Sequence, residues 1–388
     1  MRNRIEALTG VRFLAAIWVV AYHYRSVVVF PPILKQVVDQ GRAGVGLFFV
    51  LSGFILYHTY RGWFASGVSR RQYWSFARAR FARVFPMSVV GLLLMTPVTL
   101  AAIKLAPNAL PDGVTPNMLG LSWLLNLGLV HIYWPSPAIQ YPWDVPTWSL
   151  ADEVFFYALL PFLIAPILRF AASLRRLFGL AALFYGLELL AYCAFVVLLQ
   201  RDASANQYVA ADLWGYRLPI FRTWEFLLGV VAAIAVERGL KVPRWSLVLA
   251  LGLAVIPTPA DGPWWTFRWF ALFTPLWALG IAWLATDSGL LTRLFSARLS
   301  VLLGEASYAL YLTHWTTVHL LLLINRTSTA DSVISLLVTI GVSILLFKYV
   351  ETPCRKWLRG RVTSAAVQAA PLAAADASST AARAAVAV

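Results

Sequence analysis

The chain has 388 residues, of which 60% are hydrophobic and 13% are charged. A soluble domain of this size cannot bury so much apolar surface, so the mean hydropathy of +0.71 indicates that lipid solvates most of the molecule. The net charge of +15 does not indicate nucleic-acid binding, because the basic residues stand in short clusters between apolar runs, where topology signals belong. We therefore expect an all-α integral membrane protein whose main partner is the lipid bilayer.

Ten apolar runs predict membrane-spanning helices. In chain order they lie near 8–30, 44–60, 84–103, 148–168, 177–199, 219–236, 245–258, 264–285, 299–324 and 332–350. The first run follows Arg2 and Arg4 and lacks a small-residue cleavage site, which favours a retained helix over a signal peptide. A shorter apolar run at 119–133 needs a separate decision.

The basic residues of the loops indicate whether the short run at 119–133 crosses the membrane. Arg2 and Arg4 place the N-terminus inside by the positive-inside rule. If 119–133 crossed, every later basic loop would face outward, whereas all of them stay inside if it does not. We therefore predict ten spanning helices, both termini cytoplasmic, and 119–133 as a re-entrant or surface helix shielded by protein. This describes a multi-pass protein of the plasma (inner) membrane.

The chain divides into one transmembrane domain at 1–362 and an Ala-rich tail at 363–388, which we expect to be disordered and cytoplasmic. No internal repeat of the kind that inverted-repeat transporters carry is visible. Cys193 and Cys354 fall on opposite sides of the predicted topology, and no ligand spacing for a metal is present, so we expect neither a disulfide nor a metal site.

Several ionisable residues interrupt the apolar runs, where polar groups are costly and point to function. Counting about 1.5 Å per residue places His23, Glu153, His314 and Glu225 in the outer half of the membrane at similar depth. Two further residues, Arg217 and Arg222, lie just above Glu225. A polar chamber at that level is the economical interpretation, although a membrane histidine can also be a packing residue bonded to a carbonyl.

Arg12, by contrast, lies in the inner half of the first run, on the side of the basic 61–83 loop. That loop, taken alone, is first of all a topology determinant. We expect His58 to be a membrane-interface residue at a helix end. His319 is expected to have a structural role, because it faces a different side of the helix from His314.

Six sequence motifs follow one another along the chain. They are LTGVRFLAAIWVVAYH, GVGLFFVLSGFILY, FARARFARVFP, PTWSLADEVFFY, LGEASYALYLTHW and VETPCRKWL. Together they resemble the membrane-bound acyltransferase-3 family over about residues 5 to 358. The resemblance implies a multi-helix membrane enzyme that takes an acyl group, usually acetyl, from cytoplasmic acyl-CoA. The group is delivered to a hydroxyl, often on a sugar of an envelope glycan.

The resemblance also implies site residues. The family's first-helix arginine and histidine fall on Arg12 and His23, and its Arg-x-x-Arg motif falls on Arg80 and Arg83, with Arg78 an extra neighbour. The Trp-Ser-Leu-x-x-Glu motif and the late Tyr-x-x-Tyr-Leu-x-His pattern fall on Trp148, Ser149, Glu153, Tyr308, Tyr311 and His314.

One position departs from the family. Many members carry an acidic residue where this chain has Gly46, and we expect Glu153 to supply the missing carboxylate.

We predict catalytic roles for His23, Glu153 and His314. A neutral imidazole suits a general base, so we assign deprotonation of the acceptor hydroxyl to His23, with a covalent acyl-His23 intermediate as the alternative. Glu153 would fix the His23 tautomer, and His314 would orient the acceptor or donate to the developing oxyanion.

Binding roles fall to other residues. The cofactor-binding set, which would hold the phosphates of acyl-CoA and line its route, is Arg12, Arg78, Arg80 and Arg83. The predicted acceptor-binding residues are Trp148, Ser149, Arg217, Arg222 and Glu225.

Alternatives stay open at this stage. The acceptor is expected to be a saccharide or lipid-linked glycan, with a lipid or a macrolide-type small molecule as the alternative. A transporter or flippase with an intramembrane His/Glu relay, or a non-catalytic assembly subunit, would not require acyl-CoA turnover.

Overall fold

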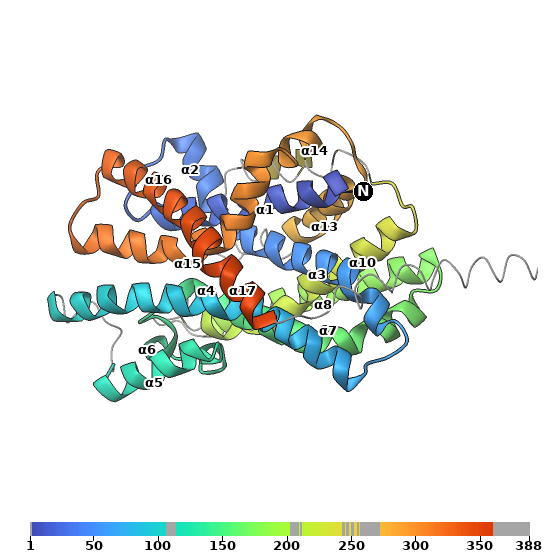
Figure 1. Cartoon of the computed structure of the whole chain (residues 1–388), viewed down its shortest axis with the longest axis horizontal. Coiled ribbons are helices and arrows are strands. Elements are labelled where there is room, and N and C mark those ends of the chain that lie inside the picture. Colours follow the sequence, from blue (N-terminus) through green and yellow to red (C-terminus); the bar gives the residue numbers. More distant parts are fainter. Residues whose placement is uncertain are drawn as a thin grey trace, which may run out of the picture.

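The computed structural model describes residues 2–105, 114–201, 212–242 and 272–359, together with residue 209 and scattered positions between 245 and 256. Within these residues the regular structure is helical and no strand occurs (Figure 1). The protein is therefore an all-α integral membrane protein, as its apolar composition predicts. The Ala-rich tail at 363–388 lies outside the described residues, so its disorder stays a prediction.

Eight helices of 18 residues or more form the body of the molecule. They are α1 (Arg2–Tyr24), α3 (Ala43–Phe64), α4 (Arg70–Leu105), α7 (Trp148–Phe170), α8 (Leu174–Arg201), α10 (Pro219–Glu237), α15 (Arg298–Leu323) and α16 (Thr329–Leu346). Shorter helices connect or extend them: α2 (Pro32–Asp39), α5 (Pro116–Leu127), α6 (Pro137–Gln140), α13 (Phe273–Thr286), α14 (Leu290–Phe295) and α17 (Thr352–Arg359). Single turns are η2 (His131–Tyr133), η3 (Val145–Thr147), η4 (Asp212–Tyr216) and η6 (Phe347–Glu351).

Seven helices in the described part of the chain are long and apolar enough to cross a membrane. They include α1, α3, α4, α7, α8, α10 and the continuous α16–α17 segment. Helix α15 has the necessary length with 26 residues, and α13 is a shorter apolar helix. The predicted run at 245–258 lies largely outside the described residues, so the total of ten spans stays a prediction.

Helix α5 does not have the length to cross. Its 12 residues extend about 18 Å, against a hydrocarbon core of about 30 Å. It begins at an N-cap Thr115 whose side chain accepts from the Met118 amide, and Pro116 follows at the first helical position. Ser122 Oγ then donates to the Ile139 carbonyl over 2.6 Å, which ties α5 to α6. This is the surface or re-entrant segment predicted for 119–133.

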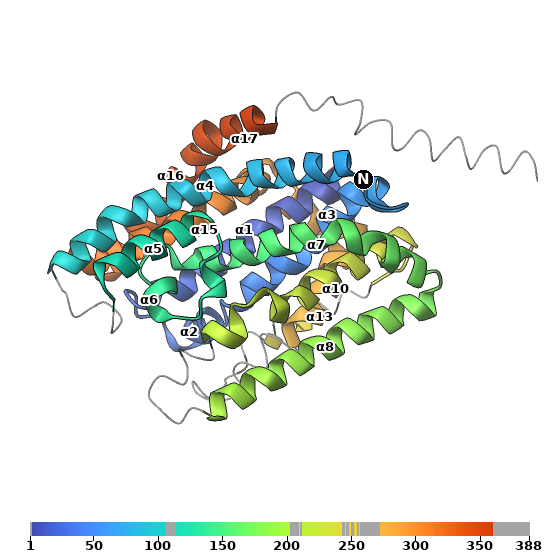
Figure 2. The same cartoon turned by 90° about the horizontal axis from the view of Figure 1, so that it is seen from below.

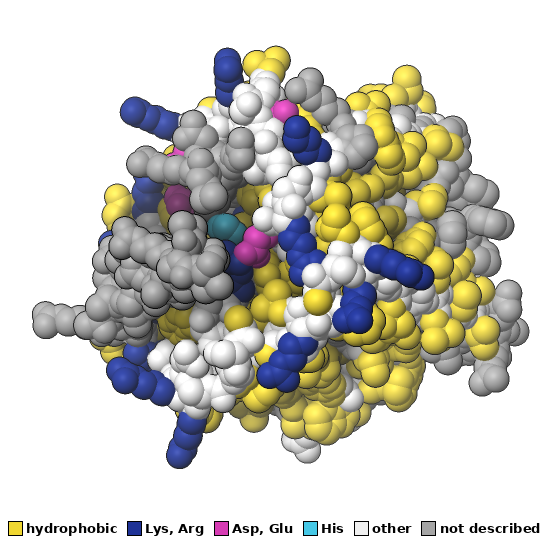
Figure 3. All heavy atoms as spheres, turned by 90° about the vertical axis from the view of Figure 1, so that its right-hand side faces the viewer, with side chains coloured by type: hydrophobic (Ala, Val, Ile, Leu, Met, Phe, Trp, Pro, Cys, Tyr) yellow, Lys and Arg dark blue, Asp and Glu magenta, His cyan; other side chains and the backbone are white. Residues whose placement is uncertain are grey.

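The basic connections gather at one end of the bundle. The N-terminus and the α3–α4 and α7–α8 turns all lie at the right in Figures 1 and 2. Lys and Arg side chains are grouped on this end face (Figure 3). Arg61, in the last turn of α3, forms an ion pair with Glu237 at the end of α10. We call this the basic end; the positive-inside rule predicts that it faces the cytoplasm.

Two glycines bring α3 and α10 into close contact. A Cβ at Gly53 would lie 1.9 Å from the Phe226 carbonyl oxygen, and a Cβ at Gly229 would lie 1.9 Å from the Val50 carbonyl oxygen. Any larger residue would force the two backbones apart, so glycine at both positions permits helix contact of the small-residue kind found in membranes. The same contact places the N-terminal half of α3 against the polar turn of α10.

Candidate active site

A pair of histidines joins the two halves of the chain. His23, one residue before the end of α1, and His314, in the middle of α15, are 291 positions apart. Their Nδ1 and Nε2 atoms lie 2.8 Å apart, and their rings stack with an interplanar angle of 25°. The edges of Tyr22 and Trp315 enclose His23, at ring-centroid distances of 5.3 and 5.1 Å. The two histidines, which the sequence predicts at one membrane depth, are thus in direct contact.

The hydrogen bonds of the neutral rings determine which nitrogen carries each proton. Nδ1 of His314 lies 3.3 Å from the Leu310 carbonyl oxygen, and a carbonyl oxygen can only accept, so this nitrogen carries the hydrogen. Nε2 of His314 then has a lone pair and accepts from Nδ1–H of His23. Nε2 of His23 then carries a lone pair that accepts no hydrogen bond from any residue that the structure describes, which is the form that a general base requires.

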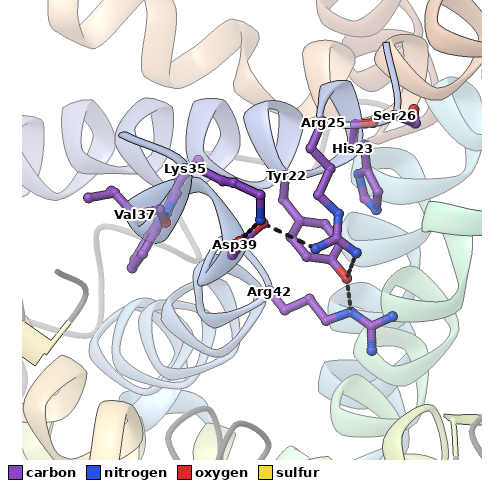
Figure 4. A network of polar contacts seen from close by, with 9 residues as sticks. Tyr22, His23, Arg25, Ser26, Lys35, Val37, Asp39 and Arg42 are labelled. Carbon is purple, nitrogen blue, oxygen red and sulfur yellow. Dashed lines mark hydrogen bonds and ion pairs between the residues drawn. The ribbon is translucent and has the colours of Figure 1, made fainter. Parts of the chain in front are cut away.

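A charged network surrounds the end of α1. Tyr22 accepts hydrogen bonds from Arg25 and Arg42, each over 2.9 Å, and lies beside His23 (Figure 4). Arg42 also pairs with Asp212 of η4 over 3.2 Å. The guanidinium groups of Arg25 and Arg42 therefore lie close to the histidine pair, at the end of the bundle opposite the basic end.

Asp212 also accepts hydrogen bonds from two further side chains near the histidine pair. The Arg217 guanidinium donates to it over 2.7 Å, and the Tyr141 hydroxyl donates over 3.2 Å. Burial and the Asp212 carboxylate raise the pKa of Tyr141 to about 12, so its hydroxyl stays protonated and can donate. Arg217, which we predicted to bind the acceptor, is thus engaged in an ion pair near the histidines.

A second buried network lies between α3, α8, α10 and α13. Arg222 and Glu225, three residues apart on α10, form an ion pair of 3.0 Å with side chains almost fully buried. Thr274 donates to Glu188 of α8 over 2.5 Å, and its oxygen lies 3.4 Å from Glu225. The Arg222 guanidinium also faces the ring of Trp148 at 6.0 Å. Arg222, Glu225 and Trp148 are therefore brought together, in a network separate from the one at the histidine pair, whereas the sequence predicted a single polar chamber.

This network corrects the expectation about the missing carboxylate. A Cβ built on Gly46 would lie 3.2 Å from Oε1 of Glu225. The carboxylate beside Gly46 is therefore that of Glu225 from α10, whereas we expected Glu153 to take this place.

Two adjoining pockets, which we call together the internal cavity, lie within the bundle. The first, the arginine compartment, has a volume of about 510 Å³ and has Arg12, Arg80 and Arg83 in its wall. The second, the tyrosine compartment, has a volume of about 400 Å³ and reaches Ser149 and Tyr311. The two adjoin at four shared lining residues, which are Arg12, Phe48, Glu153 and Tyr308.

The wall of the tyrosine compartment contacts the histidine pair. The hydroxyls of Ser149 and Tyr311 lie 2.8 Å apart, and the Tyr311 ring centroid lies 5.8 Å from that of His314. The imidazole groups are therefore behind Tyr311, on the far side of this wall from the compartment. Ser149, which the sequence predicted to bind substrate, lies in the same wall.

Glu153 has a different place from the one predicted. Its carboxylate accepts a hydrogen bond of 2.7 Å from Tyr157 and lines both compartments of the cavity. Within the described residues the side-chain hydrogen-bond partner of His23 is His314. The group that fixes the His23 tautomer is therefore an imidazole and not the Glu153 carboxylate.

The predicted phosphate-binding arginines separate into two groups. Arg80 donates to the Tyr60 hydroxyl over 3.1 Å, and Arg83 forms an ion pair with the buried Glu351 of η6. Both side chains line the arginine compartment, as does Arg12. Arg78 lies on another face of α4, in the wall of a separate hollow.

Some buried polar residues went unnoticed in the sequence. Asp152 is completely buried next to Glu153, and neither of its oxygens has a hydrogen-bond partner among the described residues. Glu188 is an isolated acid in an apolar run, a signal that could have identified it. Tyr22, Arg42 and Asp212 stand near helix ends, where such a signal is absent because polar residues are common there.

The fold is that of a multi-pass helical membrane protein with an internal cavity and, next to it, a pair of histidines. The family model for the acyltransferase-3 family, described as an acyltransferase domain, matches residues 5–348. The chain belongs to this family and is an acyltransferase that transfers groups other than amino-acyl groups. The transporter and non-catalytic alternatives raised by the sequence are set aside on this ground.

Two curated proteins are similar to this chain over most of its length. The chain is 31% identical to the acyltransferase MdmB of Streptomyces mycarofaciens, over 92% of this chain and 93% of that protein. It is 24% identical to the peptidoglycan O-acetyltransferase OatA of Listeria monocytogenes, over 92% of this chain but only 56% of OatA. No solved structure matches the chain.

Proposed function

We propose that this membrane acyltransferase moves an acyl group, acetyl in the first instance, from acyl-CoA to a hydroxyl of a saccharide or lipid-linked glycan. The setting is the plasma (inner) membrane, with the donor entering from the cytoplasm. The observation that supports the proposal is the pair of adjoining pockets, with three arginines in the wall of one and Tyr311, which contacts His314, in the wall of the other. We infer one internal path from these arginines to the histidine pair. The name of OatA supports the choice of a glycan acceptor.

The arginine compartment would bind the donor. Coenzyme A carries phosphates, and the planar guanidinium of Arg80 can form charge-assisted hydrogen bonds with their oxygens. Arg12 and Arg83 face the same space and add positive charge. The extended pantetheine arm, roughly 15–20 Å on bond-length grounds, would then follow the cavity past Glu153 and Tyr308.

The histidine pair would perform the chemistry. Nε2 of His23 removes the proton of the acceptor hydroxyl while the hydroxyl oxygen attacks the thioester carbonyl. The resulting His23 imidazolium keeps its Nδ1–H bond to Nε2 of His314, a charge-assisted bond that stabilises it. The tetrahedral intermediate then collapses to the ester, and the leaving thiolate of coenzyme A takes the proton from His23.

The hydroxyls of Ser149 and Tyr311 lie close to this reaction and can donate to the oxyanion. His314 thus changes its proposed role from orienting the acceptor or donating to the oxyanion to positioning His23. The covalent acyl-His23 route uses the same lone pair and differs in whether the enzyme itself becomes labelled.

The test is turnover of radiolabelled acetyl-CoA by purified protein in detergent, with and without extracted envelope glycan. We expect label to appear in the glycan with the wild type and not with His23→Ala. His58→Ala, which removes an exposed histidine of α3, is the matched control and should retain activity. Equal turnover by wild type and His23→Ala would refute the assigned base. Label found only in a lipid or small-molecule fraction would refute the glycan acceptor.

A further inference from the structure

A second hollow lies between α4 and α7, outside the internal cavity. Its volume, which includes space open to the surroundings, is about 1780 Å³, against about 510 Å³ for the arginine compartment. The two share a wall formed by Arg80, Val84 and Tyr157. The acyl-transfer path described above does not use this hollow, which we call the α4–α7 groove.

One face of α4 forms the floor of the groove. Arg71, Trp74, Arg78, Phe81 and Phe85 line it at alternating spacings of three and four residues, which places them in a single stripe. The stripe extends about 21 Å along the helix axis. Its two exposed arginines lie toward the basic end, and its last two rings, Phe81 and Phe85, stack at 4.5 Å.

The opposite wall is apolar. Val154 and Ala158, one turn apart on α7, line it, and Gly128 and Leu129 close the end that is farther from the arginines. Trp74, Phe81 and Val154 have exposed fractions of 61%, 48% and 42%. Large apolar side chains so exposed on two candidate spans indicate that the groove opens to lipid.

The charge of the groove is of one sign. In the part of the chain that the structure describes, its charged lining residues are three arginines and no carboxylate. Arg71 and Arg78 form no ion pair with any described residue. The ring of Tyr73 contacts that of Phe162 at 5.5 Å, about two turns before α7 ends at Phe170. The arginine half of the stripe thus lies beside the last third of α7, toward the basic end.

We propose that the α4–α7 groove binds one anionic glycerophospholipid of the leaflet at the basic end. Its phosphate lies between Arg71 and Arg78, where juxtamembrane arginines attract anionic headgroups. One acyl chain, roughly 20 Å when extended on bond-length grounds, follows the apolar stripe past Phe81 and Phe85. A cationic half and an apolar half in one groove match this amphiphile, whereas a soluble anion would leave the apolar half empty.

The test is native mass spectrometry of the full chain with phosphatidylglycerol or phosphatidylcholine of identical acyl chains. We expect phosphatidylglycerol to bind roughly tenfold or more tightly, and the double variant Arg71→Ala/Arg78→Ala to lose this preference. The matched control is Arg175→Ala/Arg176→Ala, which removes two exposed arginines at the start of α8. Ala158→Trp, which fills the groove without changing charge, should weaken binding of both lipids.

A second measurement needs no variant. Phosphatidylglycerol with a diazirine in its acyl chain should crosslink wild-type protein within α4 at 81–85 or within α7 at 154–158. Crosslinks confined to other helices would overturn the proposal. So would an equal loss of binding in the α8 control, or displacement of the lipid by coenzyme A, which would assign the groove to the donor.

Discussion

The two ends of the internal path differ in how their charges are arranged. The arginine compartment has three guanidinium groups in its wall, and Arg83 is balanced by the buried Glu351. At the other end, two imidazole groups bond to each other and to the Leu310 carbonyl. The first arrangement suits an anion that must be held, and the second suits a proton that must be moved.

One helix connects these ends. Arg12 and His23 are eleven positions apart on α1, which is about 16 Å along its axis. That distance matches the reach of the pantetheine arm. In the proposed mechanism, donor binding and chemistry are separated along the path, so substitutions at its two ends should affect different kinetic constants.

The largest effect is expected for His23. His23→Ala removes the base, and we expect kcat for acetyl transfer to fall by about 10²–10⁴-fold. The measurement is the rate of coenzyme A release from saturating acetyl-CoA by protein that elutes as a single species. A kcat close to that of wild type would place the base elsewhere.

The second-largest loss of activity is expected for substitutions of His314. His314→Ala removes the acceptor for Nδ1–H of His23, and we expect kcat to fall roughly 10–100-fold, as for other residues that orient a reacting group, with the KM for acetyl-CoA unchanged. His314→Gln retains an acceptor oxygen and should recover part of the loss. His319→Ala is the matched control on the same helix, because among the described residues the hydrogen-bond partner of the His319 ring is the Trp315 carbonyl of its own helix. Equal losses for His314→Ala and His319→Ala would indicate a packing defect in α15.

The arginine end should respond in KM. Arg80→Ala should raise the KM for acetyl-CoA about tenfold with little change in kcat, since one charge-assisted bond is lost. Arg83 is best tested as Arg83→Ala/Glu351→Gln, because the single variant would leave a buried carboxylate without its partner. Arg175→Ala, an exposed arginine on α8, is the control. An unchanged KM in both test variants would exclude these residues from donor binding.

The Gly46 position should affect stability. Gly46→Asp would place a second carboxylate beside the buried Glu225, and we expect the thermal midpoint to fall by several degrees. Combining it with Glu225→Gln should restore most of the loss. If the double variant is as unstable as the single one, steric crowding and not charge is the cause.

The smallest effect is expected for the tail. Truncation after residue 362 should leave the specific activity of acetyl transfer unchanged, because the site lies wholly within α1 to α17. A large loss of activity in a protein that still inserts would show that 363–388 takes part in function.

Much of this arrangement is predictable from the sequence, for a physical reason. Polar residues are costly in lipid, so His23, His314 and Arg12 stand out in apolar runs and their depth follows from counting residues. Helix α5 could be recognised as non-spanning, since charge placement excluded a crossing.

Depth counting does not give the direction in which a side chain points or the helix that faces it. For this reason Glu153 was placed beside His23, although it faces Tyr157 in the cavity wall. The proximity of Glu225 to Gly46 depends on the close contact of α3 with α10, which involves residues some 180 positions apart. Such contacts leave no local pattern in the sequence.

The most direct test of a single path from arginines to histidines is photolabelling with an acyl-CoA whose acyl group is a short diazirine. The account predicts that label reaches peptides containing Ser149, Tyr311 or His23, and that Arg80→Ala reduces this labelling. Label confined to the loops of the basic end, with none beside the histidine pair, would contradict it.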